Sequence, residues 1–373
     1  MKKTINSLQI LRAVALIAVY CYHQLLADEA YSRFGVCVFF ILSGFLNIYR
    51  GYDRDHERGI MSSVRYGLSK IKKIYPLHII MLAVAFVLEI ISRGEQYASD
   101  VFTHLFTVIV KLVLNVFLIS DWIPHIEILD KITGEYNIAT WFLSCLLLFY
   151  ILTPTILRVM HRIYDDELSV HGLKPYLVSV LIIVFVIIEN IFFYTTLGES
   201  RSFWIIYESP FSRIGDYLVG AQLGFIYLKT DYDGIREQSG DHKAVTMGVT
   251  ALAFSVYICI TLIALGMRLP NNYRWIVSSG FYFTIPVSIL IFSLASIDVY
   301  FDKYSESPIS HALIWLGGIS SYVYLIHVPV INCVHGIYKR VCEVNVLVWT
   351  VISAVVTLVL SVIYERIIWK RHT

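Results

Sequence analysis

The sequence predicts an all-α fold: a polytopic transmembrane helical bundle of about ten spans, with the N- and C-termini in the cytoplasm. Only 16% of the 373 residues are charged, whereas an ordinary soluble domain has about 25%. Hydrophobic residues make up 57% of the chain, and its mean hydropathy is +0.67. These values exclude a disordered chain, a collagen-like fibre and a disulfide scaffold, so the class of protein that remains is a membrane protein.

Apolar runs of about 20 residues, the length that a bilayer core requires, recur along the whole chain. A further run at 101–119 is ambiguous, because it contains His104, Lys111 and Asn115 and precedes a polar stretch. No linker or low-complexity segment interrupts the chain, so residues 1–373 are predicted to form one transmembrane domain. The ten predicted spans lie near 8–26, 35–50, 74–92, 139–158, 176–196, 213–229, 245–267, 275–297, 312–336 and 346–368.

The distribution of Lys and Arg favours ten spans over eleven, since basic residues concentrate in cytoplasmic loops. If 101–119 does not cross, the cytoplasmic segments hold 19 Lys and Arg and the outer segments hold 10. If it does cross, the contrast falls to 16 against 12. Because the basic residues lie in membrane-flanking loops, the net charge of +2 does not indicate nucleic-acid binding. The N-terminal run lacks a small-residue cleavage site and is interpreted as an uncleaved first span.

The six cysteines predict neither a disulfide framework nor a metal site. Five of them lie inside apolar runs, where Cys behaves as a small hydrophobic residue. Only Cys342 falls in a predicted loop. No CxxC pair or Cys/His spacing typical of zinc sites occurs, so no bound metal is predicted.

Polar residues inside predicted spans are costly and therefore indicate function. Arg12 and His23 lie in the first span, and the helical rotation between them ends about 20° from three full turns. They therefore share one face, about 16 Å apart along the axis, with Arg12 near the cytoplasmic end. Each residue alone fits a simpler interpretation, an Arg that snorkels to headgroups and an idle interfacial His. The pair on one stripe favours a shared polar cavity.

Two further motifs each allow a structural and a functional interpretation. Ser43, in the run GVCVFFILSGF at 35–45, fits close helix packing as well as catalysis. A basic cluster of Lys70, Lys72 and Lys73 precedes the third span. It fits ordinary anchoring on the cytoplasmic side, and it also fits a phosphate-rich ligand at a helix N-terminus.

The later spans contain small-residue and aromatic motifs. The Gly220 and Gly224 pair is interpreted as a packing face. Trp141 and Ser144 lie at the start of the fourth span, and His327 lies deep in its span, where it requires a partner or a water-filled cavity. Three charged residues allow two interpretations of equal weight: they line an outer vestibule, or they meet lipid headgroups. They are Glu189, Arg213 and Asp216.

From about residue 8 to 330, these motifs occur in an order that resembles the acyltransferase-3 family of integral membrane sugar O-acyltransferases. The resemblance is carried by the Arg12-x10-His23 spacing, GVCVFFILSGF, the basic cluster before Tyr75-Pro76, the Trp141 motif and SSYVYLIH at 320–327. Each motif alone is weak, whereas five in order are specific. The family core has ten spans, in agreement with the charge count. The chain resembles the short form, in which no periplasmic domain follows the core.

The resemblance implies a multi-pass enzyme of the bacterial inner membrane that transfers an acyl group, usually acetyl. It implies acetyl-CoA as a co-substrate with no bound cofactor, and as acceptor a hydroxyl of a surface polysaccharide or lipid-linked glycan. By position, His23 and Arg12 correspond to the catalytic pair, and Lys70 and Lys73 to basic residues before the Tyr-Pro motif, with Lys72 adjacent. The residues specify no oligomeric state. The remaining candidates for substrate binding are Ser43, Trp141, Ser144, Tyr324 and His327.

The chain departs from the family at two positions. An acidic residue often stands where Cys37 lies, and a glutamate at or near Leu146, but both are apolar here. This predicts that another residue orients the histidine. Lysines in place of arginines keep the charge but lose bidentate phosphate geometry.

The leading hypothesis places the phosphates of CoA at the cytoplasmic rim and its thioester toward His23. The imidazole then either removes a proton from the acceptor hydroxyl or is itself acylated. One alternative is a transporter or flippase whose pathway the polar stripe lines. Against it, the sequence shows no internal repeat and no broken helix pair. A second alternative is a membrane glycan polymerase, and this function would require a large soluble loop with several carboxylates.

Overall fold

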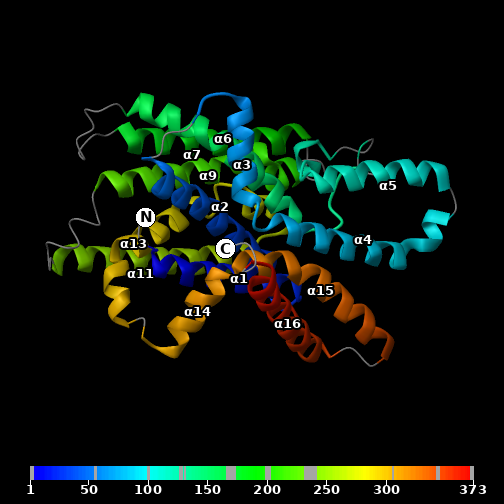
Figure 1. Cartoon of the computed structure of the whole chain (residues 1–373). Helices are drawn as coiled ribbons and strands as arrows, with labels where there is room; N and C mark the ends of the chain where they lie inside the picture. Colours follow the sequence, from blue (N-terminus) through cyan, green and yellow to red (C-terminus); the bar gives the residue numbers. More distant parts are fainter. Residues whose placement is uncertain are drawn as a thin grey trace.

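The computed structural model of the chain describes residues 4–53, 57–98, 101–125, 129, 132–164, 174–197, 203–230, 242–304, 306–341 and 345–369. This part of the chain is a helical bundle in which no strand occurs (Figure 1), as the sequence predicts. Cys342, which was predicted to lie in a loop, is outside the described residues.

Each of the ten predicted segments contains helix. The long helices are α1 Asn6–His23, α2 Glu29–Gly51, α3 Ile60–Ile71, α4 Tyr75–Ala98, α5 Val101–Val116, α6 Thr140–Ile163, α7 Lys174–Leu197, α9 Pro210–Lys229, α11 His242–Gly266, α13 Thr284–Tyr304, α14 Pro308–Gly318, α15 Ser320–Val341 and α16 Val346–Ile363. The short ones are η1 Ser120–Trp122, η2 Trp204–Glu208, η3 Asn271–Tyr273, α12 Trp275–Ser278 and η4 Tyr364–Trp369.

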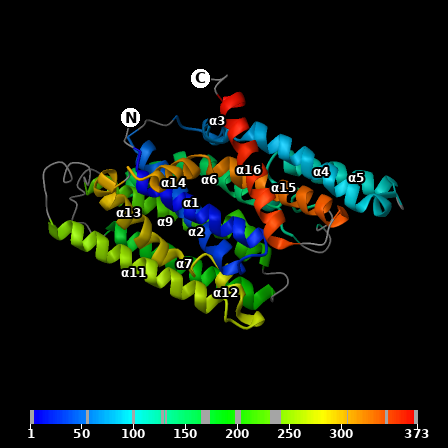
Figure 2. The same cartoon turned by 90° about the horizontal axis from the view of Figure 1, so that it is seen from below.

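Among the described residues, six helices are long and apolar enough to cross a membrane, namely α2, α4, α6, α7, α11 and α16. The pair α14 and α15 adds a seventh if it counts as one span. The ten-span topology therefore stays a prediction. The apolar part of α5, Leu105–Val116, is shorter than a span. The start of α1 and the end of η4 lie on the same side of the bundle (Figure 2).

The segment predicted as one span at 312–336 is instead two helices, α14 and α15, bent by 74° at Ile319. The Gly317–Gly318 pair explains the break, because glycine weakens a helix by about 1 kcal/mol relative to Ala. The hydroxyl of Ser320 donates to the carbonyl of Gly317 across the bend. The expectation that the chain has no broken helix pair was therefore wrong, and it no longer counts against a transporter.

The segment predicted at 275–297 also begins differently. Only Trp275–Ser278 is helical before a break, and α13 starts at Thr284. Helix α3 was not predicted at all, because its residues were counted only as part of the basic cytoplasmic stretch 50–73. It packs on α6, where a Cβ on Gly67 would overlap the side chain of Ile151.

The core forms around α2, whose apolar stretch is 83% buried, whereas those of α7 and α11 are only 11% buried. Helix α2 packs most extensively on α9, which the small residues on both helices allow. A Cβ on Gly220 would overlap the carbonyl of Ile41, and one on Gly44 would overlap the carbonyl of Tyr217. The packing interpretation of the α9 glycines is thus confirmed. Helices α1 and α13 flank this pair (Figures 1 and 2).

Arg213 and Asp216 lie inside the bundle, so they neither meet headgroups nor line an outer vestibule. They are 2% and 1% exposed, and Nη2 of Arg213 lies 3.3 Å from Oδ2 of Asp216. The hydroxyl of Thr284 also donates to Oδ1 of Asp216, at 2.9 Å. A buried ion pair of this kind requires good geometry and further hydrogen bonds to offset its desolvation.

Candidate active site

Two cavities lie at the two ends of the polar stripe on α1. The first, which we call the basic cavity, has a volume of about 400 Å³ and is lined by Arg12, Arg50, Lys70 and Lys73 among others. The second, the histidine cavity, has a volume of about 310 Å³ and includes His23. Arg12 and His23 therefore line two cavities, one at each residue, and the prediction that they share one polar cavity was wrong.

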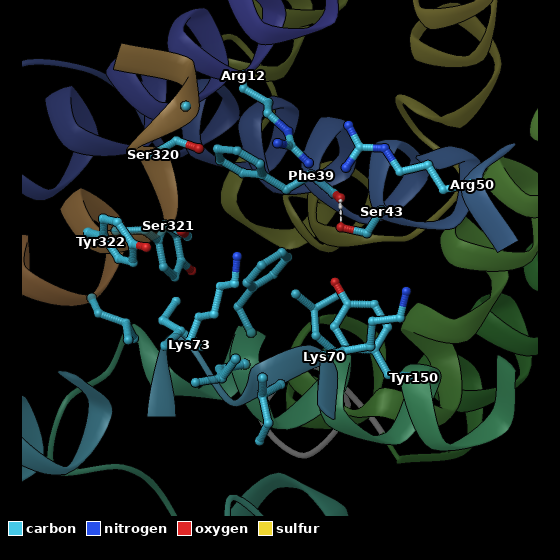
Figure 3. A pocket seen from close by; sticks show the side chains of 18 residues that line it. Arg12, Phe39, Ser43, Arg50, Lys70, Lys73, Tyr150, Ser320, Ser321 and Tyr322 are labelled. Atoms are coloured by element: carbon cyan, nitrogen blue, oxygen red, sulfur yellow. Dashed lines mark hydrogen bonds between the residues drawn. The ribbon is translucent and has the colours of Figure 1, made fainter. Parts of the chain in front are cut away.

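The basic cavity gathers four cationic side chains from separate elements. Arg12 from α1 and Arg50 from α2 extend from one wall, while Lys70 and Lys73, from the end of α3 and the turn after it, extend from the opposite wall (Figure 3). No acidic side chain lines this cavity in the described part of the chain. Such a site suits a polyanion, because several phosphate oxygens could each meet a cationic donor.

Serine hydroxyls and a tyrosine complete the basic cavity. Ser320 and Ser321 reach it because the bend between α14 and α15 exposes the first turn of α15 (Figure 3). On α2 the hydroxyl of Ser43 donates to the carbonyl of Phe39 at 2.7 Å, and Tyr150 of α6 lies opposite (Figure 3). The predicted residue Ser43 thus lines the basic cavity and not the histidine cavity.

The histidine cavity is aromatic, with one buried cation. His23 is the last residue of α1, and its ring centroid lies 5.1 Å from that of Tyr22. The guanidinium of Arg33 lies 3.5 Å above the ring of Tyr207, which in turn lies 4.8 Å from Trp141. The cavity thus offers flat aromatic faces and a guanidinium beside an imidazole.

His327 adjoins His23 from α15. Their ring centroids are 5.0 Å apart and their planes meet at 62°. His327 is 1% exposed, and its Nδ1 lies 2.6 Å from the carbonyl oxygen of Tyr324, which requires Nδ1–H to donate. Its Nε2 has no hydrogen-bond partner among the described residues. A neutral imidazole in this tautomer carries a lone pair on Nε2, and a polar atom buried without a partner is costly.

Three aromatic rings separate the two cavities. Phe39, Phe142 and Tyr324 contact one another, with ring centroids 6.0 Å (Phe39–Phe142), 6.1 Å (Phe39–Tyr324) and 5.3 Å (Phe142–Tyr324) apart. All three line the basic cavity, and Tyr324 also lines the histidine cavity. We call this trio the aromatic partition. Tyr324 is thus the member of the trio at which the two cavities adjoin.

A group of carboxylates lies next to the histidine cavity, in the segments before α6 and α9. Ser120 donates to Oδ2 of Asp121 at 3.1 Å and to Oε1 of Glu135 at 3.3 Å. Glu208 lines the cavity itself. Burial, and then the charge of Asp121, raises the pKa of Glu208 to about 7. The same two causes raise the pKa of Glu135 well above its usual value.

The predicted site residues divide among three places. Arg12, Ser43, Lys70 and Lys73 line the basic cavity, His23 and Trp141 line the histidine cavity, and Tyr324 lies between the two. Three predicted residues line neither cavity: His327, which adjoins His23 from α15, Ser144 and Lys72. Ser144 is fully buried and donates to the carbonyl of Leu118 at 2.9 Å, while Lys72 lies in a separate groove.

Several site residues were missed, because the sequence offered another explanation for each. Arg50 and Arg33 were counted only in the distribution of basic residues among the loops, and Glu208 was not singled out. Phe39 and Phe142 belong to apolar runs in which any aromatic residue fits. The charge of Arg50, at the predicted cytoplasmic end of the same span as Ser43, was the one signal that could have placed it at the site.

The two departures from the family pattern differ in the structure. The Sγ of Cys37 lies 4.0 Å from Oδ1 of Asp216. The carboxylate of Asp216, from α9, therefore lies beside the position at which the family often has an acidic residue. Leu146 lines the basic cavity as an apolar residue. In the part of the chain that the structure describes, no group of three or more His, Cys, Asp or Glu side chains could hold a metal ion.

Comparison with known proteins places the chain in a family. The sequence profile of the acyltransferase-3 family, described as an acyltransferase domain, matches residues 5–366. The chain belongs to this family, which confirms the resemblance inferred from the motifs. No solved structure matches the chain.

The chain is similar to several curated proteins at low identity. A Staphylococcus aureus (strain COL) protein named "Putative O-acetyltransferase SACOL0978" is 24% identical over 342 residues, which cover 88% of this chain and 51% of the relative. O-acetyltransferase OatA of Staphylococcus aureus (strain NCTC 8325 / PS 47) is 22% identical over the same shares of the two chains. Acyltransferase MdmB of Streptomyces mycarofaciens is 29% identical over 171 residues, 42% of this chain and 40% of the relative. The chain thus spans about half the length of the first two relatives.

Proposed function

We propose that the protein is a bacterial inner-membrane O-acyltransferase that moves an acetyl group from acetyl-CoA to a hydroxyl of a surface polysaccharide or lipid-linked glycan. The observation that carries the proposal is the pair of cavities on one helix, one cationic and one containing His23, with a shared wall at Tyr324. Family membership supports acyl transfer as the reaction.

The donor occupies the basic cavity in this proposal. The phosphates of CoA are polyanionic and cannot enter hydrocarbon, so they stay with Arg12, Arg50, Lys70 and Lys73 at the predicted cytoplasmic side. The pantetheine arm is thin and neutral, and it passes the aromatic partition. Its thioester carbonyl then reaches the neighbourhood of His23.

The transfer takes place at His23. A neutral imidazole nitrogen removes the proton from the acceptor hydroxyl as the hydroxyl oxygen attacks the thioester carbonyl carbon. The C–S bond then breaks, and the departing thiolate takes the proton from the imidazolium, so the products are the acetyl ester and CoA. General-base catalysis of this kind contributes about 10²–10⁴-fold. An acyl-imidazole intermediate would use the same groups in two steps.

His327 is the positioning residue in this proposal, in the place of the carboxylates that the family carries elsewhere. The Tyr324 carbonyl fixes its tautomer, and the free lone pair on Nε2 is available to accept a hydrogen bond beside the His23 ring. An oriented imidazole keeps the correct nitrogen toward the acceptor. No charged orienting group is then required.

A sugar acceptor suits the histidine cavity. Trp141, Tyr207 and Phe203 line it and offer faces for the apolar side of a pyranose ring, while Arg33 and Glu208 offer polar groups for its hydroxyls.

Mass spectrometry of the host's surface glycans tests the proposed function. Three strains are compared: one with the protein, one without it, and one with the His23→Ala variant at equal membrane abundance. We expect a base-labile acetyl increment only with the intact protein. The same increment with His23→Ala would overturn the assignment of His23, and no increment in any glycan would overturn the glycan acceptor.

A transporter or flippase is the second candidate, because α14 and α15 form a broken helix pair beside the basic cavity. Consumption of acetyl-CoA by purified protein separates the two functions. An acyltransferase consumes it in proportion to added acceptor glycan, and a transporter consumes none.

A further inference from the structure

A third cavity, the largest of the three, lies behind the turn between α3 and α4. Its volume is about 950 Å³, and its walls come from α3, α4, α6, the end of α5 and η4. Apolar side chains such as Leu68, Pro76 and Phe117 form much of its surface. Leu68 and Phe117 are 51% and 61% exposed, so the cavity is a groove open at the protein surface. Its neighbours α4 and α16 are long and apolar enough to cross a membrane.

Basic side chains accompany this apolar surface. Arg65 and Lys72 line the groove but not the basic cavity, whereas Lys70 lines the basic cavity but not the groove. Lys73 lines both. Tyr364 of η4 donates to the carbonyl of Lys73 at 3.0 Å, which holds the α3–α4 turn between the two cavities. Three neighbouring lysines of the sequence thus serve two different cavities.

Arg65 has a weak contact with a carboxylate among the described residues. Its Nη1 lies 3.9 Å from Oε2 of Glu57, and both side chains are at least 75% exposed. Exposed ion pairs at this distance are screened by water and salt. The groove therefore keeps a basic character, because no acidic side chain lines it in the described part of the chain.

We propose that this groove binds one anionic phospholipid, with its phosphate at Arg65, Lys72 and Lys73 and its acyl chains over the apolar surface. A soluble phosphate compound would leave the apolar walls exposed to water, and a zwitterionic lipid would gain little from three cations. The location agrees with this occupant, since the positive-inside count places this end of α3 and α4 at the cytoplasmic leaflet, which carries anionic lipid. The inference is independent of the proposed function.

Retention of lipid by the purified full-length protein tests the proposal. Wild type, Lys72→Gln and Lys70→Gln are reconstituted in nanodiscs of phosphatidylglycerol and phosphatidylcholine, then extracted in detergent, and the lipid bound per chain is measured by native mass spectrometry. Lys70→Gln is the matched control, because it removes a neighbouring charge outside the groove. We expect wild type and Lys70→Gln to retain one phosphatidylglycerol. Lys72→Gln should bind it about fivefold more weakly, the effect of one basic residue near an anionic surface.

A second variant separates a lipid from a free phosphate. Leu68→Glu places a negative charge on the apolar wall at an exposed position, so folding, checked by size exclusion and circular dichroism, should be preserved. We expect it to lose phosphatidylglycerol, and we expect inorganic phosphate at about 10 mM, a concentration that screens surface charges only weakly, not to displace the lipid from wild type. Equal retention by Lys72→Gln and wild type, equal retention of phosphatidylcholine, or displacement by phosphate would overturn the proposal.

Discussion

The two cavities on α1 differ in the kind of group that they bring together. The basic cavity collects exposed or half-buried cations from three elements, and its shape depends on the bend between α14 and α15. The histidine cavity collects aromatic rings, a buried guanidinium that lies over one of them, and the imidazole of His23, which His327 adjoins. The first arrangement suits the binding of a flexible polyanion. The second suits chemistry that requires a defined geometry.

This difference predicts that variants of the two cavities affect different kinetic constants. A loss of charge in the basic cavity should weaken donor binding and leave the chemical step intact. A loss of an imidazole in the histidine cavity should slow the chemical step and leave donor binding intact. A single site, by contrast, would show both effects together.

The largest effect is expected from His23→Ala. Removal of the general base should lower kcat about 10³-fold, within the range for such groups, with the KM for acetyl-CoA unchanged. Steady-state release of CoA in proteoliposomes measures this. His335→Ala is the control, since His335 is stacked on Trp349 at 4.6 Å and lines neither cavity. Wild-type kcat in His23→Ala would remove the histidine cavity from the mechanism.

His327→Leu should have the next largest effect, a fall in kcat of about 10²-fold, because the ring of His23 loses the group that positions it. His327→Gln retains an acceptor and should recover part of the activity, with the pH profile displaced relative to wild type. A merely structural role predicts equal losses in both variants and an unchanged pH profile. The pH–rate profiles of the three proteins decide between these outcomes.

In the basic cavity, Lys70→Gln and Arg50→Gln should each raise the KM for acetyl-CoA about tenfold, the effect of one charge-assisted hydrogen bond, with kcat unchanged. Lys72→Gln is the neighbouring control, and its KM should equal that of wild type. If Lys72→Gln raises KM as much as Lys70→Gln, the phosphates contact the whole basic cluster and the separation into two cavities is wrong.

The aromatic partition should set the length of the acyl group. Phe39→Leu removes a ring from a half-buried position and keeps an apolar side chain there. We expect the rate with butyryl-CoA relative to acetyl-CoA to rise about threefold, within the range that one or two methylenes contribute to specificity. Hydrolysis of the donor without acceptor should rise as well. An unchanged ratio would show that the acyl group takes another route.

The smallest effect concerns stability. Burial and the charge of Asp121 raise the pKa of Glu208 from 4.5 to about 7, although Arg33 opposes them. The folded chain therefore binds more protons than the unfolded chain between these pH values, so the free energy of unfolding falls as the pH rises from 4.5 to about 7. Glu208→Gln should remove this loss and raise Tm at pH 8 by about 2 °C relative to wild type. No difference at pH 8 would contradict the burial of this charge.

Composition and charge pattern predicted the membrane bundle, and the spacing of Arg12 and His23 predicted a common polar stripe. These features follow from properties of single segments, namely hydropathy, loop charge and helical period. The same is true of the Gly220 and Gly224 packing face on α9.

The features that the sequence did not predict depend on how the segments pack against one another. The bend at Ile319 follows a glycine pair that an apolar run also tolerates, and it opens α15 onto the basic cavity. The separation of Lys70 from Lys72 depends on the direction of the turn between α3 and α4, which hydropathy does not specify. Asp216 was interpreted equally as lining an outer vestibule or meeting headgroups, because the sequence could not show that Arg213 pairs with it inside the bundle.

The central claim is that donor binding and chemistry reside in different cavities. The most direct test is a binding titration of a thioether analogue of acetyl-CoA, which cannot transfer its acyl group, to wild type, His23→Ala and the Arg50→Gln/Lys70→Gln double variant. We expect His23→Ala to bind the analogue with wild-type Kd although it is inactive, and the double variant to bind it about a hundredfold more weakly. Loss of binding in His23→Ala together with wild-type Kd in the double variant would contradict the claim.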